Sequence, residues 1–177
     1  MIGKLIAGAI VITALIAGGA MYYLQEYGFY ETVEASSENA NIQITNLVTQ
    51  APEPMLIAGF EGIDADSSPI RYRACFTTPM SNAMMTETFQ TYPAAEPLVA
   101  PKQFSCFDAR KLGADIETGT ATVYLGQANI IYGIDRVIAV YDDGRAYAWH
   151  QINTCGEHAF NGDPVPASCP PVPSEKE

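Results

Sequence analysis

The sequence of 177 residues is 48% hydrophobic and only 16% charged, and its 20 acidic and 9 basic residues give a net charge of −11. A nucleic-acid-binding protein needs a basic face that replaces counterions on phosphates, and this charge balance argues against one. Collagen, coiled coils and repeat arrays are excluded as well, because the sequence shows no heptad and no fixed-period repeat. The length suits one modest domain with an appended segment.

An uncharged, apolar segment covers residues 5–24, directly after residues 1–4. At a helical rise of about 1.5 Å per residue, it would span roughly the 30 Å hydrocarbon layer of a bilayer. Aromatic residues follow at once, where membrane proteins place an interfacial aromatic belt. These residues are Tyr22, Tyr23, Tyr27, Phe29 and Tyr30. We therefore expect residues 5–24 to form a transmembrane anchor.

A cleaved signal peptide is the alternative interpretation of this segment. Gly18, Gly19 and Ala20 supply small residues before a cleavage site. However, the apolar run continues to Leu24, beyond the usual length of a signal core, and the aromatic residues favour retention. We therefore favour an uncleaved anchor.

Charge on the two flanks predicts the orientation of this anchor. Lys4 precedes it, whereas no basic residue follows it before Arg71. Because basic residues mark the cytoplasmic flank, we expect residues 1–4 to be cytoplasmic and the chain after the anchor to lie outside the cytoplasm.

All four cysteines lie in the exported part: Cys75, Cys106, Cys155 and Cys169. An even number in an oxidising compartment predicts two disulfides, for which three pairings exist. We favour Cys75–Cys106 and Cys155–Cys169, because the second bond would close a short loop beside the Pro-rich end of the chain. Zinc binding is the alternative, but the sequence has no C-x-x-C pair.

The exported part divides by composition into three segments. Residues 25–41 are polar and acidic and form the expected juxtamembrane tether, residues 42–160 form a globular domain, and residues 161–177 form a Pro-rich tail. The expected elements of the domain are strands over residues 42–47, 70–76 and 120–125, and helices over residues 81–92 and 108–118 with Ser81 and Asp108 as N-caps.

Residues 142–144 (Asp-Asp-Gly) give the strongest local signal, because Asp-Gly between two β-rich runs marks a tight hairpin. Its strands cover residues 136–141 and 145–152. In the second strand, small side chains share one face and large aromatic side chains share the other, which predicts a sheet packed against helices on one side. The expected fold class is α+β: a transmembrane helix followed by a small, disulfide-stapled domain with a mainly antiparallel sheet and two helices.

Three strings of residues carry a resemblance to a known family. They are Arg71-Tyr-Arg-Ala-Cys-Phe76, Tyr132-Gly-Ile-Asp-Arg-Val137 and Tyr147-Ala-Trp-His-Gln-Ile-Asn153. With the N-terminal anchor and a closing Cys-Pro-Pro, the chain resembles a family of single-pass membrane proteins from alphaproteobacteria that hold a domain of unknown function, some of them labelled histidine kinases. The resemblance implies a protein of the bacterial inner membrane with a periplasmic domain. The kinase label has no support in these residues, because a glycine-rich ATP lid and a phosphoacceptor helix are missing.

His150 is the first candidate for a functional residue. Near Asp135 or Arg136 across the hairpin, its imidazole could act as a base with an orienting partner. A strand histidine beside a tryptophan is more often a hydrogen-bonded sheet residue, so we favour a structural role. Arg71 and Arg73 share one strand face and form the second candidate, which would bind an anion or carboxylate or pair with the surplus acids.

Three further clusters contain residue types that bind metals. They are Cys155 with His158, the thioethers of Met80, Met84 and Met85 for Cu(I), and Asp64 with Asp66 for calcium. Each has a plainer interpretation. A disulfide would remove Cys155, methionines at this spacing usually fill a core, and no glycine-centred loop with a closing Glu follows Asp66. We therefore expect no metal and no cofactor.

The absence of a nucleophile elbow, an HExxH motif, a haem-attachment motif and a phosphate loop disfavours an enzyme. We expect a non-catalytic accessory module that binds a larger inner-membrane complex through its anchor helix and acidic periplasmic face, with no nucleic-acid partner. The alternative is a periplasmic ligand sensor or small enzyme with a site near His150, Arg71 and Arg73.

Overall fold

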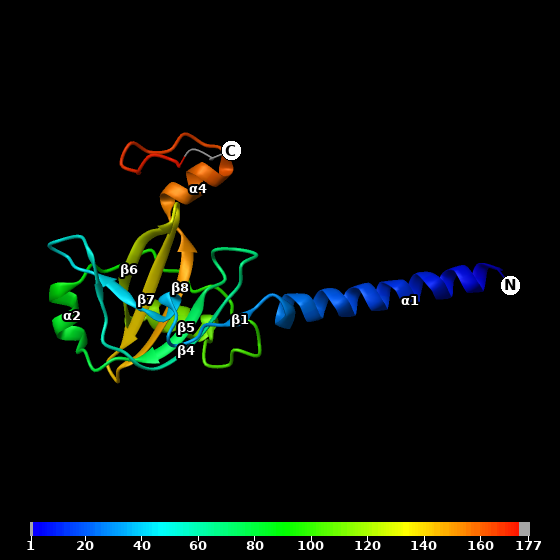
Figure 1. Cartoon of the computed structure of the whole chain (residues 1–177), viewed down its shortest axis with the longest axis horizontal. Coiled ribbons are helices and arrows are strands. Elements are labelled where there is room, and N and C mark those ends of the chain that lie inside the picture. The colour runs from blue at the N-terminus through cyan, green and yellow to red at the C-terminus, as the bar shows by residue number, and fades with distance from the viewer. Residues whose placement is uncertain (1, 174–177) are drawn as a thin grey trace.

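A long helix projects from a domain built on a six-stranded sheet in the computed structural model, which describes residues 2–173 (Figure 1). Helix α1 (Ile2–Tyr23) continues into one π-helical turn, η1 (Leu24–Gly28), and none of its residues is buried. This helix is long and apolar enough to cross a membrane, as the sequence predicts, and a signal sequence would have the same properties. Met1 and the end of the expected Pro-rich tail, residues 174–177, lie outside the described residues.

The main sheet is antiparallel throughout and confirms the predicted fold class. Its strands, in spatial order, are β1 (Glu31–Thr32), β4 (Ala58–Asp64), β5 (Arg73–Thr77), β8 (Arg145–Ile152), β7 (Ile134–Tyr141) and β6 (Ala121–Ile131). A second, two-stranded sheet pairs β2 (Gln43–Thr45) with β3 (Pro52–Pro54). The strand expected over residues 42–47 is thus shorter than predicted and lies outside the main sheet.

The predicted hairpin lies in the interior of the sheet, with β5 on one side of it and β6 on the other. Strands β7 and β8 pair so that Val140 lies opposite Ala146, and the Gly144 N–H donates to the Tyr141 carbonyl across the turn. Gly144 has a φ of +85°, a left-handed conformation that glycine adopts without strain. Every residue of β7 is buried, as expected for a strand that is covered on both faces.

Helices cover both faces of the sheet, whereas the sequence predicted helices on one side. Helix α2 (Asn82–Thr88) and the small sheet enclose a first core. This core includes Ile44, Tyr72, Met85, Tyr124 and Ile138. Helix α3 (Ala109–Glu117) encloses a second core on the opposite face. That core includes Phe107, Leu112, Val137, Ala139 and Trp149. Burying each large side chain contributes roughly 1.5–3 kcal/mol of transfer free energy, so the two cores together hold the sheet in place.

Both predicted N-caps are present. Ser81 Oγ accepts a hydrogen bond from the Met84 N–H, and Asp108 Oδ1 accepts from the first turn of α3. Helix α2 ends at Thr88, four residues earlier than predicted, because the Gln90 N–H turns away and donates to the Thr45 carbonyl.

Four elements lie outside the predicted set. They are β1, β3, β4 and a fourth helix, α4 (Thr154–Asn161), while the 3-10 turn η2 (Glu38–Ala40) adds a short helical segment. Figure 1 shows α4 beyond the end of the sheet, above the β6–β7 turn. Its N-cap is Asn153, whose Oδ1 accepts from the Gly156 N–H.

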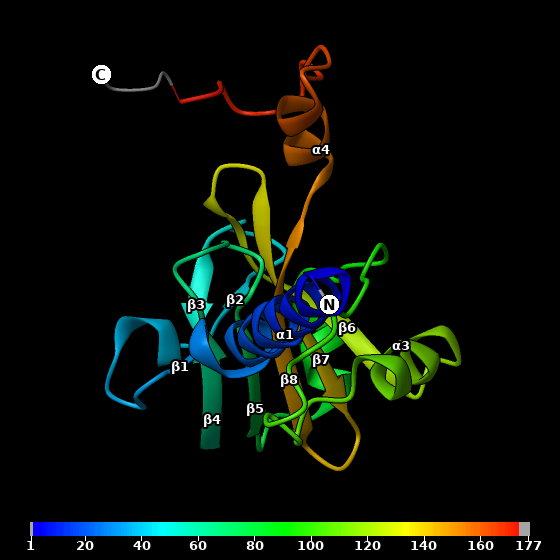
Figure 2. The ribbon, with the colours of Figure 1, turned by 90° about the vertical axis from the view of Figure 1, so that its right-hand side faces the viewer.

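The two disulfides pair as predicted. Cys75–Cys106 joins β5 to the segment of residues 93–107, which we call the strap, and Cys155–Cys169 joins α4 to the segment that follows it. The strap runs between β5 and α3 on the second-core face. Figure 2 looks along α1 toward the domain and shows the strands of the main sheet behind α1 and α3 to one side of it.

Candidate functional site

His150 pairs with Arg136 rather than with Asp135. The register of β7 and β8 places Arg136 directly opposite His150, and Arg136 Nε donates to His150 Nε2 over 3.0 Å. The other ring nitrogen, Nδ1, lies 2.8 Å from the Pro69 carbonyl oxygen. A carbonyl only accepts, so this network assigns the proton to Nδ1, which donates to Pro69. Both nitrogens of the imidazole are therefore occupied within the chain.

The surroundings of His150 keep its ring neutral. Tyr72 stacks on the imidazole with ring centroids 4.6 Å apart, and the guanidinium of Arg136 lies 4.2 Å from the centroid of the Tyr72 ring. Burial, followed by the positive charge of Arg136, lowers the pKa of His150 to about 3. A base with so low a pKa accepts protons poorly at neutral pH, so this arrangement suits a structural role better than general-base catalysis.

Arg73 is buried, and each of its three side-chain nitrogens donates to a backbone carbonyl. Nε and Nη2 donate to Leu98 and Val99 of the strap over 2.8 and 3.2 Å. Nη1 donates to Ile70 and Tyr72, in both cases over 2.7 Å. Burial lowers the pKa of Arg73 to about 10, which still leaves it charged at neutral pH. Arg73 therefore fastens the strap to the sheet.

The three residues of the predicted ligand site do not face one common pocket. Arg73 lies opposite Trp149 in the β5–β8 pair and so points to the second core, whereas His150 stacks on Tyr72 of the first core. Arg71 precedes the strand and lies over the rings of Phe29 and Tyr30, at 5.7 and 5.4 Å from their centroids. The structure thus separates Arg71, Arg73 and His150.

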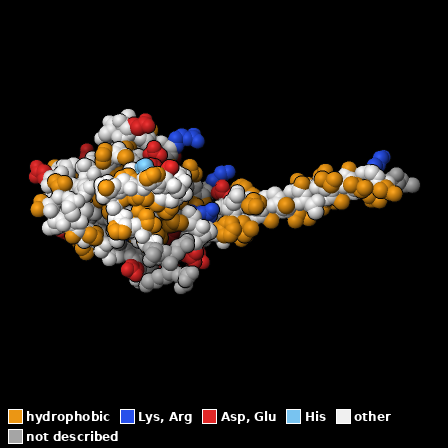
Figure 3. All heavy atoms as spheres, turned by 90° about the horizontal axis from the view of Figure 1, so that it is seen from above, with side chains coloured by type: hydrophobic (Ala, Val, Ile, Leu, Met, Phe, Trp, Pro, Cys, Tyr) orange, Lys and Arg blue, Asp and Glu red, His pale blue; other side chains and the backbone are white. Residues whose placement is uncertain are grey.

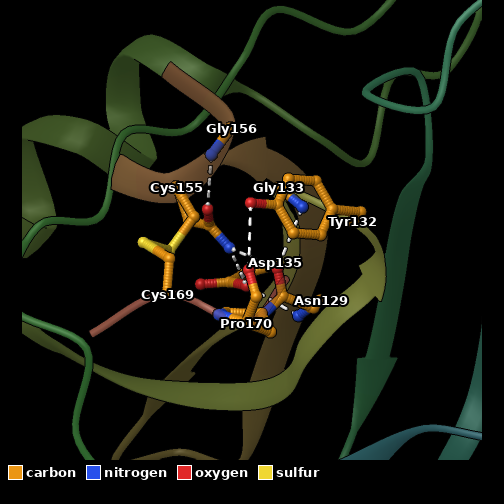
Figure 4. The surroundings of a disulfide bond; sticks show 9 residues. Asn129, Tyr132, Gly133, Asp135, Cys155, Gly156, Cys169 and Pro170 are labelled. Carbon is orange, nitrogen blue, oxygen red and sulfur yellow. Dashed lines mark hydrogen bonds between the residues drawn. A yellow bond between two sulfur atoms is a disulfide. The ribbon is translucent and has the colours of Figure 1, made fainter. Parts of the chain in front are cut away.

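Asp135 is buried at the junction of β7, the β6–β7 turn and α4 (Figure 4). Its Oδ1 accepts from the Asn129 N–H and from Asn153 Nδ2, over 2.8 and 2.6 Å, and its Oδ2 accepts from the Tyr92 hydroxyl over 3.1 Å. Burial and the charge of Asp135 raise the pKa of Tyr92, so Tyr92 keeps its proton and remains a donor. Neutral donors satisfy this carboxylate, which joins three segments of the chain.

Two hollows adjoin these residues, and both have acidic walls. The one beside His150 holds about 560 Å³ and is also lined by Asp64 and Asp66. The other holds about 410 Å³ and is lined by Tyr92, Gln151, Asn153 and others, including two acids, Glu96 and Glu157. These carboxylates favour neutral or cationic occupants over the anions that the sequence suggested for Arg71 and Arg73.

The candidate metal ligands differ in their bonding partners and in their exposure. The Cys155 sulfur is bonded to Cys169, and Met85 is fully buried whereas Met84 is 41% exposed. Asp64 accepts from Asn39 Nδ2 and from the Ala65 N–H. Within residues 2–173, no three His, Cys, Asp or Glu side chains are grouped to hold a metal ion.

Sequence reasoning missed Tyr72 and Asn153. Tyr72 is the aromatic partner of both His150 and Arg136, and Asn153 bonds Asp135 while capping α4. For Asn153 a signal was available, because an asparagine directly after a strand is a common N-cap of a following helix.

Comparison with known proteins gives one match. Residues 42–170 match the family described as a family of unknown function, DUF6446. This supports the resemblance stated above in its coarser form, as a domain of unknown function. No curated protein and no solved structure is significantly similar to the chain.

Proposed function

The chain belongs to DUF6446, a family of unknown function, and we propose that it is a membrane-anchored, non-catalytic interaction module that serves as a subunit or assembly partner of a larger membrane complex. In this proposal α1 stays attached as a single-pass anchor in the inner membrane of a bacterium. The N-terminus lies in the cytoplasm and the domain in the periplasm.

The location is supported by charge and by the disulfides. Lys4 is the only charged residue in α1, and basic residues mark the cytoplasmic flank. Both disulfides lie in the domain, and such bonds persist in oxidising compartments such as the periplasm.

The non-catalytic role rests on one observation: the polar side chains that were candidates for a functional site form their hydrogen bonds within the chain itself. His150, Arg73 and Asp135 each form hydrogen bonds from every side-chain nitrogen or oxygen to another part of the protein. Such groups stabilise the fold, and substrate binding would require breaking these bonds.

A cluster of exposed apolar side chains on the side of the domain away from α1 supports the proposal that the domain binds another protein. Val48 is 87% and Leu47 is 47% exposed in the loop between β2 and β3. The Leu47 N–H donates to the Thr88 carbonyl, which places this loop beside α2 and its exposed Met84. Figure 1 shows α2 and this cyan loop at the end of the domain opposite α1. We call Leu47, Val48 and Met84 the distal patch, and exposed apolar patches often mark contact sites.

Native membranes provide the test. Tagged full-length protein, gently solubilised, should migrate on native gels within a larger complex that contains a partner in fixed stoichiometry. Val48→Asp should release the partner, whereas Val99→Asp, at a site in the strap that is 80% exposed, should retain it. Wild-type protein that migrates alone would overturn the proposal. A reporter fused after Glu177 tests the location separately, since it should be active only if it works in the periplasm.

A ligand sensor is the second candidate, favoured by one observation. Arg136 is 3% exposed, and its Nη2 has no hydrogen-bond partner within the described chain. An uncompensated buried donor is costly, so a small polar molecule that reached this nitrogen would lower that cost. Native mass spectrometry that finds a small molecule on monodisperse protein would favour this candidate.

A further inference from the structure

We propose that the strap and the start of α3 bind the phosphate groups of anionic lipids around α1, so that the domain lies against the membrane in a fixed orientation. The inference rests on the proposed retention of α1 as an anchor. The surface concerned, which we call the lipid-facing surface, consists of Val99, Phe104, Lys102 and Arg110.

The strap lies beside the end of the domain from which the anchor departs. The Lys102 N–H donates to a carboxylate oxygen of Glu26 over 3.1 Å, and Glu26 belongs to η1, which continues α1. If α1 spans the bilayer, η1 lies at its surface and brings Lys102 to the headgroups.

Unpaired basic groups gather on the same side. Arg71 lies over Phe29 and Tyr30, which directly follow η1, and Lys102 and Arg110 line one hollow together. Among residues 2–173, the two ion pairs that form use other basic residues, Lys111 with Asp115 and Arg145 with Asp143. Figure 3 shows blue side chains near the end of the domain from which α1 departs. Lys102 and Arg110 are exposed and belong to neither ion pair, which leaves their charges available to lipid phosphates.

Apolar side chains of the strap lie beside the two exposed cations and line the same hollow. Val99 is 80% exposed although the carbonyls of Leu98 and Val99 are bonded to the buried Arg73. The backbone of the strap is therefore fixed, and its apolar side chain is presented outward without further ordering, which lowers the entropic cost of binding.

A hollow of about 460 Å³ completes the surface. Lys102 and Arg110 line it together with Val99, Phe104 and Phe107. Asp108, its one acidic lining residue, accepts two N–H groups as the cap of α3. A lining of basic and apolar side chains matches a phosphate headgroup and the upper part of its acyl chain, which favours a lipid over an acidic protein as the occupant.

A tryptophan probe tests the contact in full-length protein reconstituted into nanodiscs. Val99→Trp places the probe on the lipid-facing surface, and Val48→Trp, at a similarly exposed site on the distal patch, is the matched control. The native Trp149 is fully buried and contributes the same background to both. We expect brominated lipids to quench the Val99→Trp emission, more strongly with phosphatidylglycerol than with phosphatidylcholine, and to leave Val48→Trp unchanged.

Charge variants on the Val99→Trp background test the role of the cations. Lys102→Gln with Arg110→Gln should abolish the preference for phosphatidylglycerol, and so should high salt. Arg145→Glu changes the net charge by the same amount at the β7–β8 turn and should keep the preference. Quenching that is equal for the two tryptophan sites, or an equal effect of the two charge variants, would overturn the inference. Release of the native protein from membranes by alkaline wash would instead contradict the proposed anchor, while the nanodisc result would still decide the surface.

Discussion

Arg136 and His150 form a hydrogen bond between a guanidinium and an imidazole across the β7–β8 pair, and no ion pair involves Arg136 in the described part of the chain. A cation next to a histidine favours the neutral ring, and the neutral ring supplies the acceptor that Arg136 Nε requires. Because His150 also donates to Pro69, this pair joins β7, β8 and the loop before β5.

Replacing His150 therefore tests a structural role. We expect His150→Leu to lower the free energy of unfolding by about 1–3 kcal/mol, because the Arg136 donor and the Pro69 acceptor would stay buried without partners. His150→Gln keeps a donor and an acceptor at similar reach and should cost less. Urea denaturation of the full chain in detergent measures both. A well-folded His150→Gln protein that has lost its cellular function outright would instead indicate a chemical role for the ring.

The low pKa of His150 also predicts how stability depends on pH. The folded state holds the pKa at about 3, whereas the unfolded chain returns it to 6.5, so between these values the unfolded state binds a proton that the folded state does not. The stabilisation is fully present above the unfolded value and is lost as the pH falls through this window, by at most about 1.4 kcal/mol per pH unit. Unfolding free energies of wild type and His150→Gln should therefore converge as the pH falls from about 7 to about 4. Parallel curves would show that the ring is protonated in the fold.

Arg73→Lys should loosen the strap. A lysine ammonium cannot reach the carbonyls of Ile70, Tyr72, Leu98 and Val99 in the planar geometry of a guanidinium. We expect a loss of about 1–3 kcal/mol and faster hydrogen exchange over residues 93–107, with the rest of the domain less affected. Arg145→Lys, at an exposed site, should stay within about 0.5 kcal/mol of wild type. Unchanged exchange in the strap would mean that the Cys75–Cys106 bond and the hydrogen bonds of Gln151 to Ala94 and Glu96 hold it without Arg73.

Elements with local signals could be predicted from the sequence. The turn at Asp142, Asp143 and Gly144 fixes the hairpin, and Ser81 and Asp108 cap the helices that follow them. The strand register that follows from this turn also identifies the partner of His150. If Tyr141 lies opposite Arg145, counting back along both strands places Arg136 opposite His150 and puts Asp135 on the other face.

Contacts between distant segments could not be predicted in this way. Arg73 looked available to an anion because two of its four acceptors are carbonyls 25 and 26 residues away, and a backbone carbonyl has no sequence signature. Strand β4 was missed because its glycines break the β pattern. At Gly62 a Cβ would clash with the Phe60 ring and crowd Val33, a requirement that only the folded packing reveals.

Two helical glycines differ in the space available to an added Cβ atom, and alanine substitutions at the two positions should therefore have opposite effects on stability. Alanine favours a helix over glycine by about 0.5–1 kcal/mol, so Gly113→Ala in α3, where a Cβ meets nothing within 4 Å, should raise stability by that amount. In α4 the Cβ of Gly156→Ala would meet the Gly133 carbonyl oxygen and lie 2.9 Å from the Gly133 Cα, inside van der Waals contact.

The backbone at Gly133 cannot move aside freely, because its φ of +79° forms the β6–β7 turn. The Gly133 N–H donates to Asn129 Oδ1, and the Asn129 N–H in turn donates to the buried Asp135. We therefore expect Gly156→Ala to cost about 1–3 kcal/mol and to speed hydrogen exchange in α4, although its helix propensity improves. Urea denaturation combined with hydrogen exchange distinguishes the two variants. If both alanines stabilise the protein, α4 does not pack against this turn in solution.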